Sequence, residues 1–156
     1  MISRRGFVAL AAGLALPLSV ARRLRAGAAP AGGTPITVYK GASCGCCVKW
    51  VDHLREAGFE PTSHDEEDLD RIKDRLGIPQ PLRSCHTAQV DGYLVEGHVP
   101  AADVRKLITL KPRVAGLAVP GMPASSPGMA VPGAPHQPFE VLSFQTDGST
   151  RVYARH

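Results

Sequence analysis

The sequence predicts an α/β fold in which short strands alternate with amphipathic helices. Apolar residues recur at helical spacing in three segments, and short runs rich in strand-favouring residues stand between these segments. The pair Asp91-Gly92 separates two of the runs and is a strong signal for a β-hairpin. One domain of mixed helices and strands accounts for these observations.

The first predicted strand covers Ile36 to Tyr39, and the first predicted helix covers Cys46 to Ala57. Within that helix the apolar residues follow the spacing i, i+3, i+4 and i+7, and Gly58 ends the pattern. A second strand is predicted over Phe59 to Thr62, where Pro61 weakens the pattern because proline cannot donate a hydrogen bond to a neighbouring strand.

The second helix is predicted over Glu66 to Leu76, with Asp65 as its N-cap residue. The hairpin with its turn at Asp91-Gly92 follows, and a third helix is predicted over Ala101 to Leu110. The resulting order is strand, helix, strand, helix, hairpin, helix. This is the thioredoxin-like order, with a Cys-x-x-Cys motif at the start of the first helix.

The C-terminal part is expected to combine a Pro/Gly-rich loop with a closing hairpin. Six prolines and four glycines between Ala115 and Pro138 predict that no regular element forms there. The short apolar run from Leu117 to Val119 is expected to pack back on the domain, because burial of apolar surface is favourable. Phe139 to Gln145 and Thr150 to Ala154 are predicted to form the closing hairpin.

The N-terminal segment is predicted to be an export signal of the twin-arginine type. Arg4 and Arg5 precede an uncharged run from Phe7 to Val20, and the Ala-Gly-Ala sequence at 26–28 has the pattern of a cleavage site. A general secretory signal and an uncleaved anchor are the alternatives, and the apolar run is short for a membrane span. The expected organisation is a signal peptide at residues 1–28, a linker at 29–35 and a thioredoxin-like metal-binding domain at 36–156.

The charge balance of the predicted mature chain differs from that of the full chain. The full chain holds 18 Lys and Arg against 14 Asp and Glu, and five of the arginines lie in residues 1–28, which hold no acidic residue. The remaining 13 basic and 14 acidic residues give a net charge of −1. This balance gives no electrostatic support for binding to nucleic acid or, after signal cleavage, to a membrane surface.

Three of the four cysteines are clustered in Cys44-Gly45-Cys46-Cys47, at the predicted strand-to-helix turn. A helix N-terminus favours thiolate over thiol, and thiolates are both nucleophiles and metal ligands. If the helix begins near Gly45, Cys44 and Cys47 point to one side, and Cys46 is rotated away from both. In the thioredoxin-like order, the segment that enters the hairpin, with Cys85, is expected to pass beside this end of the helix.

The candidate metal ligands are soft donors with some imidazole, a combination that selects Cu(I) or zinc among common metals. Thioether sulfur favours copper over zinc, and we expect Met122 or Met129 to lie close to Cys44 as a neutral lid on a Cu(I) site. Two alternatives use the same cysteines: a redox site that cycles a Cys44–Cys47 disulfide, and a purely structural disulfide. The candidate ligands are Cys44, Cys46, Cys47, Cys85, His86, His98, Met122 and Met129.

The cysteine cluster belongs to a longer set of short motifs between residues 36 and 129. They are Cys44-Gly-Cys-Cys47 followed by Trp50, Ser84-Cys-His-Thr-Ala88, Glu96-Gly-His-Val-Pro100, Gly116-Leu-Ala-Val-Pro-Gly-Met-Pro123 and Ser126-Pro-Gly-Met129. With these motifs the chain resembles the domain of unknown function 411 family, which is described as small, exported, metal-binding and often linked to copper resistance. The resemblance implies periplasmic copper binding. The positions to carry over first are Cys44, Cys47, Cys85 and His86.

The sequence therefore predicts a periplasmic soft-metal binding protein, with a chaperone or sequestering role in copper resistance, rather than an enzyme. Its expected partners are the metal ion and other copper-handling proteins of the periplasm. A periplasmic thiol–disulfide oxidoreductase that uses Cys44 and Cys47 is the alternative.

Overall fold

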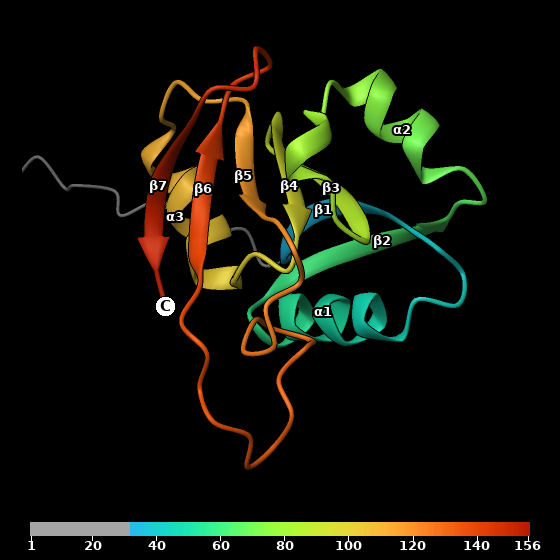
Figure 1. Ribbon diagram of the computed structural model, residues 1–156. Coiled ribbons are helices and arrows are strands. Elements are labelled where there is room, and N and C mark those ends of the chain that lie inside the picture. Colours follow the sequence, from blue (N-terminus) through green and yellow to red (C-terminus); the bar gives the residue numbers. More distant parts are fainter. Residues whose placement is uncertain (1–31) are drawn as a thin grey trace, which may run out of the picture.

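The computed structural model describes residues 32–156, and the predicted export signal at residues 1–28 lies outside them (Figure 1). In this part of the chain, seven strands join one mixed sheet in the order β2-β1-β3-β4-β5-β6-β7, together with three α-helices and a short 3-10 helix. The strands are β1 (Thr34–Lys40), β2 (Phe59–Asp65), β3 (His86–Val90), β4 (Tyr93–Gly97), β5 (Gly116–Val119), β6 (Glu140–Phe144) and β7 (Thr150–Arg155). The helices are α1 (Gly45–Glu56), α2 (Leu69–Leu76), η1 (Gln80–Leu82) and α3 (Ala101–Leu110).

The unit β1-α1-β2 places the cysteine turn at one end of the sheet. β1 and β2 pair in parallel over their whole length, from Thr34 opposite Phe59 to Lys40 opposite Asp65. β2 is an edge strand of the sheet, so Pro61 is tolerated within it and the strand is longer than predicted.

The predicted N-cap of the second helix is wrong. Asp65 is the last residue of β2, where its carboxylate forms an ion pair with the ammonium of Lys40. α2 instead begins at Leu69, after Asp68, whose side chain accepts a hydrogen bond of 3.0 Å from the backbone N–H of Arg71. Strand pairing through Asp65 competes with helix formation, so the capping role moves to the next suitable acidic residue along the chain.

The predicted hairpin is confirmed as β3 and β4. Its turn residues Asp91 and Gly92 both have positive φ, 46° and 82°, which a two-residue turn between twisted antiparallel strands requires. The pairing extends to Thr87 opposite Glu96. The hairpin thereby brings the residues just before β3 and just after β4 to the same end of the sheet.

The prediction that no regular element forms between Ala115 and Pro138 is wrong for its first residues. Gly116–Val119 form β5, which pairs in parallel with β4 and antiparallel with β6. Residues 117–119 are completely buried, so the expectation that this apolar run packs on the domain is confirmed. Four residues suffice for a strand here because both neighbouring strands satisfy its backbone hydrogen-bonding groups. Residues 120–139 contain turns but no helix or strand.

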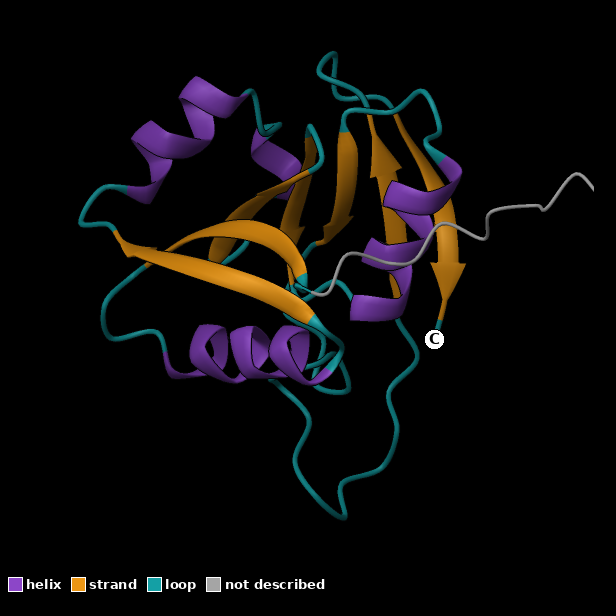
Figure 2. Cartoon of the chain, turned by 180° about the vertical axis from the view of Figure 1, so that it is seen from behind, coloured by secondary structure: helices purple, strands orange, loops and turns teal. Residues whose placement is uncertain are grey.

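Two apolar clusters lie on opposite faces of the sheet. α1 and α3 cover one face, where Trp50 and Leu107 pack with strand residues such as Val95. Leu94 and Phe144 belong to the cluster on the other face, since successive side chains of a strand point in opposite directions. α3 lies behind β6 and β7 in Figure 1 and in front of them in Figure 2. Among residues 32–156, no helix has the length and apolar character of a membrane span.

Replacing Gly116 with alanine is expected to destabilise the fold. A Cβ at this position would lie 2.0 Å from the backbone oxygen of Leu94, so β4 and β5 could not keep their spacing. We expect the free energy of unfolding to fall by about 1–3 kcal/mol, the usual effect of overpacking a core. Urea denaturation measures this, with Gly41→Ala as the control because a Cβ at Gly41 meets no atom within 4 Å. Equal stability of the two variants would contradict the expectation.

Candidate metal centre

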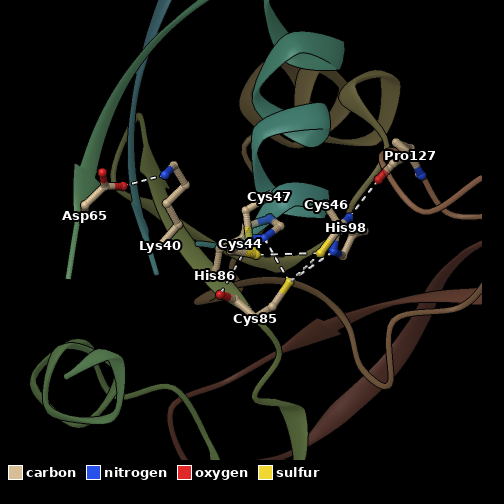
Figure 3. Close-up of a disulfide and its surroundings, with 9 residues drawn as sticks. All are labelled: Lys40, Cys44, Cys46, Cys47, Asp65, Cys85, His86, His98 and Pro127. Atoms are coloured by element: carbon tan, nitrogen blue, oxygen red, sulfur yellow. Dashed lines mark hydrogen bonds and ion pairs between the residues drawn. A yellow bond between two sulfur atoms is a disulfide. The ribbon is translucent and has the colours of Figure 1, made fainter. Parts of the chain in front are cut away.

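Four segments that are far apart in the sequence converge at the N-terminal end of α1 (Figure 3). The turn at Cys44 supplies three cysteines, the residues entering β3 supply Cys85 and His86, and His98 follows β4. The fourth segment is the loop after β5, which reaches His98 through the backbone oxygen of Pro127. The sulfur atoms of all four cysteines lie within 4.8 Å of one another, so the expected proximity of Cys85 to Cys44 is observed.

The orientation predicted for Cys46 is wrong. Its Sγ lies 3.6 Å from Sγ of Cys44 and 4.0 Å from Sγ of Cys85, so this side chain faces the other cysteines. The reason is that Cys44 precedes α1 and has non-helical backbone angles, φ −77° and ψ 90°. Helical spacing therefore does not set the direction of its side chain relative to Cys46.

Cys44 and Cys47 form a disulfide, while Cys46 and Cys85 are free thiols. Cys47 is completely buried, and its Sγ lies 3.6 Å from the backbone oxygen of Cys85. In this oxidised form the two bonded sulfurs are not thiolates. All four cysteines become available as thiolate ligands only after the disulfide accepts two electrons.

Cys85 also belongs to a second group of donor atoms. Its Sγ lies 3.0 Å from Nε2 of His98 and 3.3 Å from Nδ1 of His86, and both imidazole rings are completely buried. The two imidazole rings meet edge to face with their centroids 4.9 Å apart. The His86 ring also packs on the Trp50 ring, with the two ring centroids 4.3 Å apart. Cys85 is thus common to the four-cysteine group and to a group of one cysteine and two histidines.

A backbone carbonyl fixes the direction of the His98 ring. Nδ1 of His98 lies 2.7 Å from the backbone oxygen of Pro127, and a carbonyl oxygen only accepts hydrogen bonds. Nδ1 therefore carries the proton of the neutral ring, and Nε2 presents a lone pair to Cys85. Metal-binding histidines are commonly oriented in this way, by an acceptor that holds the other ring nitrogen.

Burial keeps Cys85 and the two histidines uncharged. Desolvation, reinforced by the neighbouring Cys46, raises the pKa of the Cys85 thiol to about 12. Desolvation also lowers the pKa of His98, and it lowers the pKa of His86 further below its usual value together with the nearby His98 and Lys73. At neutral pH the Cys85 thiol therefore donates to a neutral imidazole. A metal ion that binds here must displace the thiol proton.

A buried ion pair supports the segment that positions Cys85. Lys73 of α2 donates hydrogen bonds to Glu96 of β4 and to Thr87 of β3, and the side chains of Lys73 and Glu96 are 3% and 0% exposed. Glu96 also accepts from the backbone N–H of Ser84, the residue before Cys85. Sequence reasoning missed this network. One signal in the sequence could have indicated it. Lys73 falls on the apolar stripe of its helix, where a buried ammonium needs a partner of opposite charge.

The two candidate methionines lie in the loop after β5. Met122 stands in a turn with φ 47° and is 41% exposed. Met129 is half-buried and follows Gly128, which packs on α1. Their approach to the cysteines stays a prediction.

Sequence reasoning also missed Pro127, because its contribution is a backbone oxygen, which leaves no signal in the identity of the side chain.

The donor chemistry of these residues fits a soft or borderline metal ion. Thiolate sulfur suits Cu(I) and zinc, and imidazole suits copper and zinc. Nε2 of His86 is buried and has no hydrogen-bond partner among residues 32–156, so this ring has bonding capacity that the protein does not satisfy. The nitrogens that face Cys85 are Nδ1 of His86 and Nε2 of His98, so the cysteines have two nitrogen donors from a separate part of the sheet.

Comparison with known proteins agrees with this chemistry. The chain matches the family described as "Protein of unknown function, DUF411" over residues 82–129, a stretch that includes Cys85, His86 and His98. Two solved structures, named copper resistance protein copG form 1 and form 2, are similar to the chain, each with a TM-score of 0.74. Their identities to this chain are 44% and 43%, and each match covers 80% of this chain and 98% of the solved one. No curated protein sequence matches the chain.

Proposed function

Because the chain belongs to the DUF411 family, and the solved structures similar to it are named copper resistance proteins, we propose that it is an exported protein that binds copper and sequesters or delivers it. The main support is the convergence of four cysteines with two histidines around the Cys85 sulfur. Three separate parts of the fold supply these donors. A purely structural disulfide would not need Cys85 to lie 3.0 Å from a histidine whose proton is fixed on its far nitrogen.

Cu(I) is the ion that the sulfur donors favour, and zinc is the second choice. With the disulfide reduced, the four cysteines would supply thiolates, and Cys85 would give up its proton on binding. His98 or His86 would complete the set of ligands with an imidazole nitrogen. These donors would bind and orient the ion.

We also propose that the domain has a thioredoxin-like fold and that the protein is exported. The parallel pair β1 and β2, followed by antiparallel β3 and β4, supports the thioredoxin-like order. Residues 1–28 would direct export to the periplasm by the twin-arginine route, and a linker would follow. The metal-binding domain would begin with β1 at Thr34, two residues before the predicted start at residue 36. Other copper-handling proteins of that compartment would be its partners.

An anaerobic titration of the reduced protein with Cu(I), against a competing chelator, tests this function. The protein should bind Cu(I) more tightly than a Cys44→Ser/Cys85→Ser variant, because the variant lacks two of the four sulfur donors. His136→Gln serves as the control, since His136 is exposed in the loop after β5 and should not affect binding. An affinity no tighter than that of the double cysteine variant would contradict copper binding at this site.

A thiol–disulfide oxidoreductase is the second candidate, and the Cys44–Cys47 disulfide at the start of α1 favours it. In that reaction a dithiol reductant first reduces the Cys44–Cys47 disulfide, and the Cys44 thiolate then attacks a substrate disulfide to form a mixed disulfide. Cys47 attacks the Cys44 sulfur of the mixed disulfide, which releases the reduced substrate and restores the Cys44–Cys47 disulfide. The reduction of insulin by dithiothreitol should then accelerate, and Cys44→Ser should abolish the effect. No acceleration by the metal-free protein would exclude this candidate.

A double variant, Met122→Leu with Met129→Leu, tests whether the thioether sulfurs contribute to Cu(I) binding. The fold should be kept, because leucine and methionine have similar volumes. Cu(I) affinity should fall while Zn(II) affinity stays nearly unchanged, because thioether sulfur prefers Cu(I). Parallel competition titrations with the two ions measure the difference. If Cu(I) affinity is also unchanged, the two methionines only fill space.

A further inference from the structure

We propose that residues 126–128, called the latch below, position His98 for metal binding, and that Gly128 is the residue on which the latch depends. The inference rests on the proposed function, because it concerns how His98 is presented to a metal ion. The latch lies in the loop after β5 and contacts both α1 and the His98 ring.

Gly128 lies directly against the first turns of α1. A Cβ at this position would meet the backbone oxygen of Cys46 at 2.7 Å and the backbone nitrogen of Trp50 at 2.9 Å. Its φ of 85° also lies in the region that side chains rarely adopt. Because both contacted atoms belong to the helix backbone, a side chain at Gly128 has no flexible neighbour to displace.

α1 is held more firmly than the latch, so the latch is the part that would move. Trp50 is completely buried in the core, and its indole N–H donates to the backbone oxygen of Val99 at 2.8 Å. Three further residues of α1, Cys47, Val51 and Leu54, are also buried. Residues 120–139, in contrast, contain no helix or strand.

The latch transmits its position to His98 through one hydrogen bond. Pro127 places its backbone oxygen 2.7 Å from Nδ1 of His98 and so keeps the proton on that nitrogen. Ser126 fixes the turn, because it is completely buried and its hydroxyl donates to the backbone oxygen of Pro123. The backbone oxygen of Ser126 also accepts from the N–H groups of Met129 and Ala130, at 3.0 and 3.1 Å.

The latch acts on only one of the two donor groups. His98 belongs to the group of Cys85 with two histidines, whereas the four cysteines are positioned by α1 and by the segment entering β3. Loss of the latch should therefore weaken binding of an ion that needs imidazole. With the Cys44–Cys47 disulfide intact, a Zn(II) titration reports on the histidine group, because Cys46 and Cys85 are the remaining thiols.

The test uses Gly128→Ala, with Gly133→Ala as the matched control. Both glycines have positive φ in the same loop, 85° and 82°, but a Cβ at Gly133 meets no atom within 4 Å. The backbone strain is thus similar, and only Gly128→Ala pushes the loop off α1. In the oxidised protein, we expect Zn(II) affinity to fall about 10–100-fold in Gly128→Ala, the range for loss of a group that orients a metal-binding histidine. Gly133→Ala should stay close to the unaltered protein.

The ¹⁵N shifts of the His98 ring in the metal-free protein give a second readout, which a general loss of stability would not produce. The unaltered protein and Gly133→Ala should show the proton on Nδ1, and Gly128→Ala should show a mixture of both tautomers. Ser126→Ala, which adds no atoms, should shift the tautomers in the same direction. If Gly128→Ala does not fold, Ser126→Ala alone tests whether the latch positions His98.

The proton on Nε2 in the unaltered protein, or unchanged tautomers and Zn(II) affinity in Gly128→Ala and Ser126→Ala, would overturn the role of the latch. A protein with the expected tautomer that binds neither Zn(II) nor Cu(I) would instead overturn the proposed function. The tautomer measurement needs no metal ion, so the two failures are distinguishable.

Discussion

Replacing Cys85 with serine should lower the affinity of the reduced protein for both Cu(I) and Zn(II) by more than about 100-fold. Loss of a group that merely orients a ligand lowers metal affinity about 10–100-fold, and loss of a ligand itself should exceed that range. Cys85 is the one residue shared by the two donor groups found among residues 32–156. Its sulfur lies 4.0 Å from Sγ of Cys46 and 3.0 Å from Nε2 of His98.

Single replacements of one residue from each donor group provide the comparison. Cys46→Ser should weaken Cu(I) binding more than Zn(II) binding, because Cu(I) is the softer ion and depends more on thiolate sulfur. His98→Gln should have the opposite selectivity, because Zn(II) depends more on the nitrogen donor. Competition titrations with each ion, on reduced protein under anaerobic conditions, measure all three variants. A Cys85→Ser protein that loses affinity for only one ion, or for neither, would show that Cys85 does not join the two groups.

Replacing Lys73 with methionine should lower the free energy of unfolding by about 3–5 kcal/mol, the usual effect of removing one partner of a buried ion pair. The Glu96 carboxylate would remain completely buried without its ammonium partner. Glu96 also holds the backbone N–H of Ser84 and the hydroxyl of Thr87, so its disturbance should loosen the segment that positions Cys85. Urea denaturation gives the stability, and Cu(I) affinity gives the effect on the site.

The loss of unfolding free energy caused by Lys73→Met should depend on pH. Burial already raises the pKa of Glu96, and the ammonium of Lys73 opposes this shift, so the variant should raise that pKa further. A carboxyl group whose pKa is higher in the folded than in the unfolded state stabilises the fold below its unfolded pKa, and that stability is lost as the pH rises through its folded pKa. The variant should therefore regain stability relative to the unaltered protein as the pH is lowered from neutral.

Two controls separate the buried pair from ordinary surface charge. Arg55→Met removes an exposed ion pair with Asp52 and should change stability little. Lys73→Met combined with Glu96→Leu removes both buried charges and should recover part of the loss. Recovery should be incomplete, because Ser84 and Thr87 then lose their acceptor. A Lys73→Met protein as stable as Arg55→Met would contradict a structural role for the pair.

Local patterns in the sequence predict most of the secondary structure, because turns and caps are set by neighbouring residues. The turn at Asp91-Gly92 needs two residues that accept positive φ, and both types are present in the sequence. α3 has its predicted bounds because Pro100 stands at its start and Lys111 leaves the helical conformation after its end, with φ 48°. The cysteine turn also lies where the local pattern of residues predicts it, at the start of α1.

Two of the errors arise where a distant part of the chain decides the outcome, and the third arises from the backbone angles of one residue. Asp65 has the features of a helix cap, but pairing with β1 keeps it in β2. Gly116 begins a stretch with the composition of a loop, but β4 and β6 complete its hydrogen bonds and make it part of a strand. The direction of Cys46 relative to Cys44 depends on the backbone angles of Cys44, which helical spacing does not fix.

The cysteines and histidines of the candidate site were recognisable from their residue types, whereas their supporting contacts were not. The carbonyl of Pro127 orients His98 and the pair Lys73–Glu96 holds the segment before Cys85. Both contacts join residues that are more than 20 positions apart, so local spacing does not identify the partner of either residue.

The most direct test of copper binding by Cys85 and His98 is a copper K-edge X-ray absorption spectrum of the reduced protein, loaded anaerobically with Cu(I). The proposed site predicts a first shell dominated by sulfur, with a nitrogen contribution from imidazole that weakens in His98→Gln. A first shell made only of nitrogen and oxygen, or a spectrum that is the same in Cys85→Ser, would contradict it.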